Sequence, residues 1–253
     1  MSQRVVVIGQ GYVGLPVAVR AVEVGFDVVG FELDPRKVEG LTAGSSHVED
    51  ITDQRLRSAI ATGRYRATAE SADLAGFDVA VISVPTPMAE GAPDLSYIET
   101  ASATLAPHIR PGSTVILEST TYPGTTEELS LPILEKGSAL KGGVDFHLGY
   151  SPERIDPGNA NYRLENTPKV VSGMNPASLE KVQGFFDQLV ERTVAVSGTR
   201  EAELTKLLEN TFRHVNIALV NELKLVYDAM GIDVWEVIAA AKTKPFGFMA
   251  FYP

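Results

Sequence analysis

The feature that most constrains the fold of this chain is a strand–glycine loop–helix–strand pattern that ends at Glu32. The apolar run Val5–Ile8 fits a strand that is buried on both faces of a parallel sheet. A G-x-G-x-x-G segment follows it, and Leu15–Val24 is then typical of a helix. Val28–Phe31 is a second apolar strand. Together these segments predict a βαβ unit with a right-handed crossover.

The glycine loop predicts a dinucleotide-binding site. In such a motif Gly9 allows the tight turn, Gly11 lets the backbone approach a pyrophosphate, and Gly14 lets the helix pack closely against the strand. The free N–H groups at the helix N-terminus favour an anion at the same place. A purely structural glycine turn is the alternative. The strand before the loop, the helix after it and an acidic residue roughly 20 residues further on favour the binding site.

Glu32 is that acidic residue, and it indicates which cofactor is bound. Its carboxylate is expected to accept hydrogen bonds from the adenosine ribose and to repel a 2′-phosphate, which favours NAD over NADP. Arg36 leaves an alternative open, because it could hold that phosphate or could simply begin the next helix beside the adenine. We expect NAD, in contact also with Tyr12 and Val13 of the glycine loop.

Apolar strands and helices continue to alternate up to Gly198. Strands are expected at Tyr65–Thr68, Asp78–Val84, Ser113–Leu117, His147–Tyr150, Lys169–Ser172 and Thr193–Val196. Helices are expected at Arg36–Leu41, Asp53–Ala61, Asp94–Ala106, Thr125–Lys136 and Pro176–Leu189. The alternation predicts an α/β fold with a doubly wound, Rossmann-like parallel sheet, which forms a NAD-binding domain over residues 1–198.

The pattern changes after Gly198. No helix breaker occurs from Thr199 to Met230, and apolar residues recur at helical spacing, which predicts one helix about 48 Å long. A helix of that length exceeds one face of a domain, so it should bridge two domains or pack in a dimer. Asp233 then caps a short helix that runs through Ala241. Residues 199–253 are therefore expected to form a separate central helical region.

Composition excludes several classes of protein. Asp and Glu outnumber Lys and Arg by 32 to 22, and a net charge of −10 argues against a nucleic-acid partner. No apolar run reaches about 18 residues and the N-terminus lacks a signal-peptide pattern, so we expect a cytoplasmic protein without a membrane span. The chain contains no cysteine, which excludes disulfides and a thiol nucleophile within it. Its four histidines show no ligand spacing, so no metal site is expected.

Further motifs follow the glycine loop in order along the chain. They are Ser-Val-Pro-Thr-Pro at 83–87, Glu-Ser-Thr-Thr-Tyr-Pro-Gly-Thr at 118–125, Tyr-Ser-Pro-Glu-Arg at 150–154, Lys-Leu-Leu-Glu-Asn-Thr-Phe-Arg at 206–213 and Asn-Glu-Leu at 221–223. The set resembles the UDP-glucose/UDP-N-acetylmannosamine dehydrogenase family over essentially the whole chain. The Thr-Tyr-Pro-Gly-Thr-Thr segment and the Lys-Pro-Phe-Gly-Phe-Met tail are most similar to the branch that acts on UDP-N-acetylglucosamine.

The resemblance implies an enzyme that oxidises the C6 alcohol of a UDP-sugar twice, to the uronic acid, with two NAD⁺ consumed. It also implies a homodimer that forms through the long helix, and a UDP-binding domain outside these residues. In the family a cysteine nucleophile holds the aldehyde for the second oxidation. That cysteine is expected beyond Pro253. The chain is therefore expected to be either the cofactor-binding part of a longer enzyme or a short remnant.

The resemblance assigns catalytic roles to Lys206 and Asn210, with Arg213 as a substrate contact. Lys206 would support proton transfer and stabilise an oxyanion, and Asn210 would position the sugar and a water. The two residues are four positions apart, so they share one face of the helix. A lone helix lysine is more often simply solvated. The asparagine and the surrounding motif favour the functional role.

Glu153 follows a predicted strand exit, where the sites of α/β proteins gather. By resemblance, this acid orders a hydrolytic water or acts as a base, and Arg154 and Ile155 line the sugar site. A surface Glu–Arg pair of little energetic consequence is the alternative. Ile155 departs from some relatives of the suggested branch, which place an acidic residue there.

Threonines lie at two other strand exits. Thr120 is expected to act in catalysis and Thr121 to contact the cofactor, because a hydroxyl there can reach the nicotinamide or a water. Turn chemistry before Pro123 is the alternative for both. Thr86, which is held rigid between two prolines, is expected to contact the cofactor ribose, unless those prolines only end the strand.

Two other functions stay open. A β-hydroxyacid dehydrogenase also joins a Rossmann domain to helices that carry Lys-x-x-x-Asn, and it needs no cysteine. A non-catalytic, NAD-binding, dimerising remnant is the third possibility. The Tyr-Ser-Pro-Glu-Arg segment speaks against the hydroxyacid enzyme. UDP-N-acetylglucosamine is the expected substrate, and the choice among gluco, manno and galacto sugars is open at this point.

Overall fold

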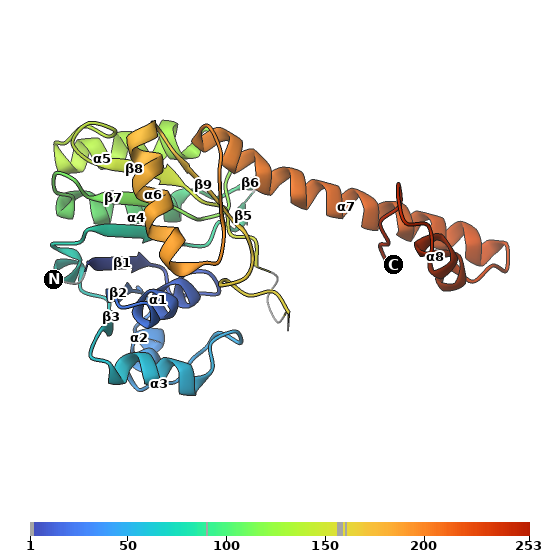
Figure 1. Ribbon diagram of the computed structural model, residues 1–253, viewed down its shortest axis with the longest axis horizontal. Helices are drawn as coiled ribbons and strands as arrows, with labels where there is room; N and C mark the ends of the chain where they lie inside the picture. The colour runs from blue at the N-terminus through green and yellow to red at the C-terminus, as the bar shows by residue number, and fades with distance from the viewer. Residues whose placement is uncertain (1–2, 90, 156–158, 160) are drawn as a thin grey trace. The chain divides into compact units, whose positions relative to one another are not determined.

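A computed structural model describes residues 3–89, 91–155, 159 and 161–253 (Figure 1). The chain divides into two compact units, residues 1–204 and 205–253, and each is described by itself. The first unit contains the sheet and the helices that cover it. The second contains most of the long helix α7 (Thr199–Ala229), the short helix α8 (Val234–Lys242) and the C-terminal segment.

The main sheet has eight strands among the described residues, in the order β10-β9-β8-β7-β4-β1-β2-β3. They are β1 (Arg4–Ile8), β2 (Asp27–Phe31), β3 (Tyr65–Thr68), β4 (Val79–Ile82), β7 (Thr114–Leu117), β8 (His147–Tyr150), β9 (Lys169–Gly173) and β10 (Thr193–Ala195). A short hairpin, β5 (Met88–Ala89) and β6 (Ala92–Pro93), lies outside it. β1 pairs in parallel with both β2 and β4, so the strand order reverses there. Ligands of open α/β sheets bind at the carboxyl ends of the strands at such a point.

One strand pair departs from the expected parallel sheet. β8 and β9 are antiparallel, with Gly149 opposite Gly173 and Tyr150 opposite Ser172. Parallel neighbours need a long crossover, usually a helix. The connection 151–168 forms no helix in the part of it that the structure describes, so β9 returns in the opposite direction. The predicted doubly wound α/β class is confirmed, because the other pairs of the main sheet are parallel.

Helices cover both faces of the sheet (Figure 1). On one face lie α1 (Gly14–Glu23), α2 (Pro35–Thr42), α3 (Asp53–Ala61) and α6 (Pro176–Leu189). On the other lie α4 (Ser96–Leu105), α5 (Leu131–Ser138) and the 3₁₀ turns η1 (Ser71–Leu74) and η2 (Ala106–His108). Along β1, Val5 and Val7 enter the first core while Val6 and Ile8 enter the second. This alternation explains why the strand is apolar throughout.

The predicted helix over Thr125–Lys136 begins as a π-helical turn, η3 (Thr125–Ser130), before α5. The first N–H groups of such a turn lack partners within it. Glu203 of α7 supplies the acceptors. Its carboxylate accepts a hydrogen bond from the Gly124 N–H at 2.6 Å, and from the N–H and hydroxyl of Thr126 at 3.0 and 2.7 Å. Burial raises the pKa of Glu203, although these three donors oppose the shift.

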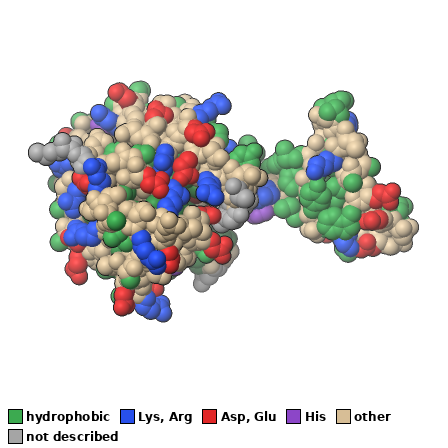
Figure 2. Space-filling view, turned by 60° about the horizontal axis from the view of Figure 1, so that its bottom comes forward, with side chains coloured by type: hydrophobic (Ala, Val, Ile, Leu, Met, Phe, Trp, Pro, Cys, Tyr) green, Lys and Arg blue, Asp and Glu red, His purple; other side chains and the backbone are tan. Residues whose placement is uncertain are grey.

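The second unit is built around α7, which is one continuous helix, as the spacing predicts. Beyond Leu204 it exposes apolar side chains at helical spacing: Leu208, Phe212, Val215, Leu219 and Val226. Figure 2 shows hydrophobic side chains gathered on this unit. Its C-terminal segment folds back, because Phe251 packs on Phe212 with ring centroids 5.7 Å apart, and Tyr252 stacks on Trp235. None of the helices in the described ranges has the length and apolarity that a bilayer crossing requires.

Replacing Glu203 tests whether it fastens η3 to α7. Glu203→Ala should lower the free energy of unfolding by about 2–4 kcal/mol, because it leaves the N–H groups of Gly124 and Thr126 without acceptors. Glu203→Gln keeps one acceptor oxygen and should cost less. Urea unfolding followed by circular dichroism measures the loss, with the exposed Glu222→Ala on the same helix as control. Equal losses for Glu203→Ala and Glu222→Ala would contradict the fastening role.

Candidate functional site

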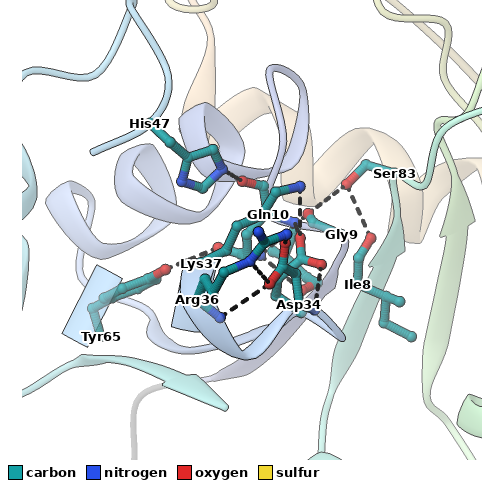
Figure 3. A network of polar contacts seen from close by, with 11 residues as sticks. Ile8, Gly9, Gln10, Asp34, Arg36, Lys37, His47, Tyr65 and Ser83 are labelled. Carbon is teal, nitrogen blue, oxygen red and sulfur yellow. Dashed lines mark hydrogen bonds and ion pairs between the residues drawn. The ribbon is translucent and has the colours of Figure 1, made fainter. Parts of the chain in front are cut away.

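The glycine loop leaves no room for a side chain at two of its three glycines. A Cβ on Gly14 would lie 1.9 Å from the carbonyl oxygen of Gly9, and a Cβ on Gly9 would lie 2.6 Å from that of Ser83. Gly9 also has a φ of +90°, which glycine adopts freely. The Ser83 hydroxyl, at the exit of β4, hydrogen-bonds the carbonyls of Ile8 and Gly9 at 3.1 Å (Figure 3). By contrast, nothing lies within 4 Å of a Cβ on Gly11.

Gln10, between two of these glycines, is fully buried and ties the loop to the sheet (Figure 3). Its Nε2 donates to the carbonyl of Val7, and its Oε1 accepts from the Tyr65 hydroxyl, both at 2.9 Å. Burial raises the pKa of Tyr65, so that hydroxyl keeps its proton and can donate. The Gln10 carbonyl lies 2.8 Å from Nε2 of His47, and its N–H donates to Glu32 at 3.2 Å.

Glu32 follows β2, and backbone groups position its carboxylate. The N–H groups of Gln10 and Asp34 donate to its two oxygens at 3.2 and 3.1 Å, and the Lys37 ammonium lies 3.7 Å away. Arg36 is directed elsewhere: its guanidinium makes two hydrogen bonds to Asp34, at 3.2 and 3.1 Å, and lowers the pKa of that carboxyl. The Arg36 side chain is otherwise 90% exposed. Glu32 is therefore the acidic group presented at this strand exit.

A cavity of about 860 Å³ follows the carboxyl edge of the strands in the first unit. Its size suits a cofactor, since such pockets hold roughly 300–1,000 Å³. In the order β2, β1, β4 and β7, the strand exits contribute Glu32, Gly9, Ser83 and Glu118 to its wall. Glu32 and Glu118 therefore stand at the two ends of this row of four strands. Residues of α4 complete the lining, among them Ser96, Tyr97 and Thr100.

The structure brings most of the sequence-predicted cofactor residues to this cavity. Those that line it are Gly9, Gly11, Tyr12, Val13, Glu32 and Thr86, and Thr120, which is predicted to act in catalysis, lines it as well. Gly14 packs behind the loop, and Arg36 is paired with Asp34. Thr121 is buried, and its hydroxyl bonds that of Thr125. The contacts of all these residues with a cofactor stay predictions.

Three buried charged side chains meet where β7 and β8 end and β9 begins. The ammonium of Lys169, the first residue of β9, bonds Oε1 of Glu118 and lies 3.0 Å from Oε2 of Glu153. Oε1 of Glu153 accepts from the N–H groups of Arg154 and Ile155 at 2.7 and 2.6 Å. Oε2 of Glu118 is buried and has no hydrogen-bond partner within the described part of the chain. Glu118 lines the cavity, whereas Glu153 and Lys169 lie behind it.

Burial and charge act in opposite directions on this cluster. Burial raises the pKa of Glu118 to about 7, since the attraction of Lys169 only partly offsets it and the charge of Glu153 adds to it. Against the same burial, Lys169 and two backbone N–H groups hold the pKa of Glu153 below its usual value. The two carboxylates likewise keep the pKa of Lys169 above its ordinary value. Near neutral pH, Glu118 is therefore the member of the cluster that gains or loses a proton.

Of the remaining predicted residues, Arg154 and Ile155 belong to the first unit and do not line the cavity. Arg154 donates a guanidinium hydrogen bond to the carbonyl of Pro168 at 2.8 Å, and Ile155 packs against the first core. Lys206, Asn210 and Arg213 lie on α7 in the second unit. There the Arg213 guanidinium donates to the side-chain oxygen of Asn210 at 3.0 Å. Their proposed roles toward a substrate stay predictions.

The site also contains residues that the sequence analysis did not single out, and Gln10, Glu118 and Lys169 are the buried ones with a clear sequence signal. Each has a sequence signal. Gln10 is a polar residue within a glycine loop, and Glu118 directly follows an all-apolar strand. Lys169 precedes the apolar pair Val170–Val171 at the start of a predicted strand. A charged residue at the end of a buried strand needs a partner of opposite charge. This requirement is the signal that links Glu118 to Lys169.

Comparisons with known proteins agree with this geometry. Residues 3–190 match the sequence model of the UDP-glucose/GDP-mannose dehydrogenase family, NAD binding domain, and residues 200–253 match that of its central domain. A UDP-N-acetyl-D-glucosamine 6-dehydrogenase of Pseudomonas aeruginosa is 40% identical over 99% of this chain. A UDP-N-acetyl-D-mannosamine dehydrogenase of Pyrococcus horikoshii is 37% identical over 96% of it. The chain spans 58% of the length of each relative.

A solved structure shows the same similarity. The UDP-D-ManNAc dehydrogenase from Pyrococcus horikoshii superposes with a TM-score of 0.92 at 37% identity. The match covers 97% of this chain and 59% of that chain. The predicted Rossmann-like fold is therefore confirmed by comparison as well as by the strand order.

Alanine at two glycines of the loop should separate folding from binding. Gly14→Ala places a Cβ against a carbonyl oxygen and should destabilise the fold by about 3 kcal/mol or more. Gly11→Ala meets open space, so its melting temperature should stay close to that of the wild type. Its added methyl group enters the side where a pyrophosphate would approach, so NAD⁺ should bind roughly tenfold more weakly. Thermal unfolding and calorimetric titration measure the two effects, and equal melting temperatures for both variants would refute the packing argument.

Proposed function

Because the chain belongs to the UDP-glucose/GDP-mannose dehydrogenase family, we propose that it binds NAD and serves the oxidation of the C6 alcohol of a UDP-N-acetylhexosamine to the uronic acid. The observation that carries the proposal is the cavity that joins Glu32, the glycine loop and the exits of β4 and β7. The family match also favours a nucleotide sugar over a small hydroxyacid. We favour UDP-N-acetylglucosamine, because the motifs at 121–126 and 244–249 support that branch.

The residues of the cavity fit a dinucleotide. Glu32, held by two backbone N–H groups, would accept hydrogen bonds from the adenosine ribose. The pyrophosphate would bind at Gly11 and the first N–H groups of α1, where the helix dipole favours negative charge. Thr86 and Thr121 would contact the remainder of the cofactor. When bound, NAD supplies the hydride acceptor for the alcohol.

The polar residues of the chain would handle protons and hold the sugar. Lys206 would stabilise the oxyanion that develops at the alcohol oxygen, and Asn210 would orient the sugar and a water. Thr120 and Glu153 would position that water, and Arg154, Ile155 and Arg213 would contact the substrate. The complete four-electron reaction also needs a nucleophile. These 253 residues contain no cysteine, so a thiol for the second oxidation would come from outside them.

Formation of NADH by the full-length protein tests the proposal. UDP-N-acetylglucosamine should give the fastest turnover among UDP-glucose, the gluco, manno and galacto N-acetylhexosamines and a small β-hydroxyacid, with NAD⁺ preferred to NADP⁺. Lys206→Met should lower kcat roughly 100-fold or more, because the oxyanion loses its cation. Lys224→Met on the same helix, which removes only an ion pair with Asp228, is the matched control. Turnover of the hydroxyacid alone would refute the proposed function, and a faster manno sugar would correct the substrate.

We also propose that the chain forms a homodimer through α7. The support is the row of exposed apolar residues on this helix in the second unit, of which Leu208 is 72% and Leu219 is 54% exposed. Such a row is typical of a face that packs against another helix. Leu219→Glu should shift the chain from dimer to monomer in sedimentation velocity, while Glu222→Gln should leave the dimer intact. A wild-type monomer at micromolar concentration would contradict the proposal.

A further inference from the structure

The roles above leave one buried acid of the cavity unused. Glu118 is 1% exposed, yet it belongs to the cavity wall. One of its oxygens is engaged by Lys169, and the other is buried without a hydrogen-bond partner among the residues that the structure describes. A buried unpaired carboxylate oxygen is costly. The cost falls if the group binds a proton, or if a positive charge enters the cavity beside it.

The strand order indicates which part of a cofactor would lie near Glu118. Glu32, the acceptor for the adenosine ribose, follows β2, and the glycine loop follows β1 next to it. Glu118 follows β7, which lies two strands beyond β1 on the side away from β2. A dinucleotide that starts at Glu32 and crosses the glycine loop therefore directs its nicotinamide half toward the exit of β7. The nicotinamide ring is positively charged when oxidised and neutral when reduced.

We propose that Glu118 is a proton-exchanging group coupled to the oxidation state of the cofactor: ionised beside NAD⁺, protonated beside NADH. Lys169 and Glu153 act as its positioning residues. The exchange involves one O–H bond of Glu118. Ionisation releases that proton to solvent, protonation takes one back, and no electron is transferred at this residue. The proposal rests on the proposed NAD-binding function and deepens it, because it gives the site a means to take up a proton as the alcohol is oxidised.

The groups that face Glu118 keep their own protonation states near neutral pH, so Glu118 is the group that titrates. Lys169, from β9, holds its charge between the two carboxylates, and Glu153, after β8, is kept ionised by Lys169 and two N–H groups. Tyr150 of β8 lies close enough for the charges of Glu118, Glu153 and Glu203 to act on it. Burial, with those charges, raises the pKa of Tyr150, so it stays neutral and its hydroxyl donates to the carbonyl of Ser119 at 3.3 Å. Glu118, with a pKa of about 7, responds first to a change of charge in the cavity.

Calorimetric titration of the 253-residue chain with NAD⁺ and with NADH tests the proposal without any turnover. Titrations at pH 7 in buffers of different ionisation heat count the protons released on binding. NAD⁺ should release about half a proton per site, because a carboxyl group with a pKa of about 7 is half protonated at that pH. NADH should instead take up about half a proton per site, because Glu118 is protonated beside the reduced ring. The adenosine and phosphate contacts are common to both nucleotides, so the difference between the two counts reports on the nicotinamide charge.

The pH dependence of binding has a definite sign. Since NAD⁺ favours the ionised form of Glu118, its affinity should rise by up to about tenfold between pH 6 and pH 8, whereas the affinity for NADH should not rise. Glu118→Gln should abolish the difference in proton release and flatten the NAD⁺ profile. Glu191→Gln, at an exposed position, is the matched control and should behave as the wild type.

Substitutions at Lys169 test its positioning role. Lys169→Arg keeps the positive charge and should retain the proton release at pH 7. Lys169→Met removes the charge that favours the ionised form of Glu118, so the midpoint of the NAD⁺ profile should move to higher pH. A residue that only maintained packing would not move this midpoint.

Two results would overturn the proposal. One is equal proton release by NAD⁺ and NADH in the wild type, and the other is a full difference that persists in Glu118→Gln. If Glu118→Gln does not fold, the proposal is tested by the proton counts of the wild type with NAD⁺ and NADH and by the two Lys169 variants. A wild type that binds neither nucleotide would instead overturn the proposed function, and this inference with it.

Discussion

The close approach between the glycine loop and the exit of β4 is the constraint on which the rest of the site depends. Gly9 and Gly14 meet carbonyl oxygens where any Cβ would overlap, and the Ser83 hydroxyl bridges the ends of β1 and β4. The loop thereby holds the start of α1 at Gly14, beside the ends of β1 and β4. Because the neighbouring strands run parallel to β1, their exits reach the same edge. Glu32, Ser83 and Glu118 consequently share one cavity.

Buried carboxylates occur in two different settings in this fold. Glu203 accepts three hydrogen bonds from the start of η3, so each of its oxygens has a donor and the group serves to hold two segments together. Glu118 shares Lys169 with Glu153 and keeps one oxygen without a donor in the described structure. In a medium of low dielectric constant, a charge with all its hydrogen bonds made is costly to separate from its partners, whereas a partly bonded one is sensitive to nearby charge. The first arrangement is structural, and the second suits a site that responds to its ligand.

Much of the fold and part of the site could be predicted because the signals are local. The apolar run before Gly9 and the absence of breakers after Thr199 each indicate a single element, and β1 and α7 are found there. The direction of β9 could not be read in the same way, since it depends on how the chain returns after β8. The partner of Arg36 could not be predicted either. Its guanidinium reaches the carboxylate of Asp34 only once the turn before α2 has formed.

The sequence by itself determined the class of fold, the glycine loop, the acidic residue after β2 and the match to the two family domains. Each of these features depends on residues that are close together along the chain. Only the tertiary structure decided that Glu118, Lys169 and Glu153 form one buried cluster, with Glu118 at the cavity wall. The three residues come from the ends of β7 and β8 and the start of β9, and Glu118 and Lys169 are 51 positions apart. The pKa shifts of the three groups depend on burial and on their mutual distances, and both exist only after the strands have assembled.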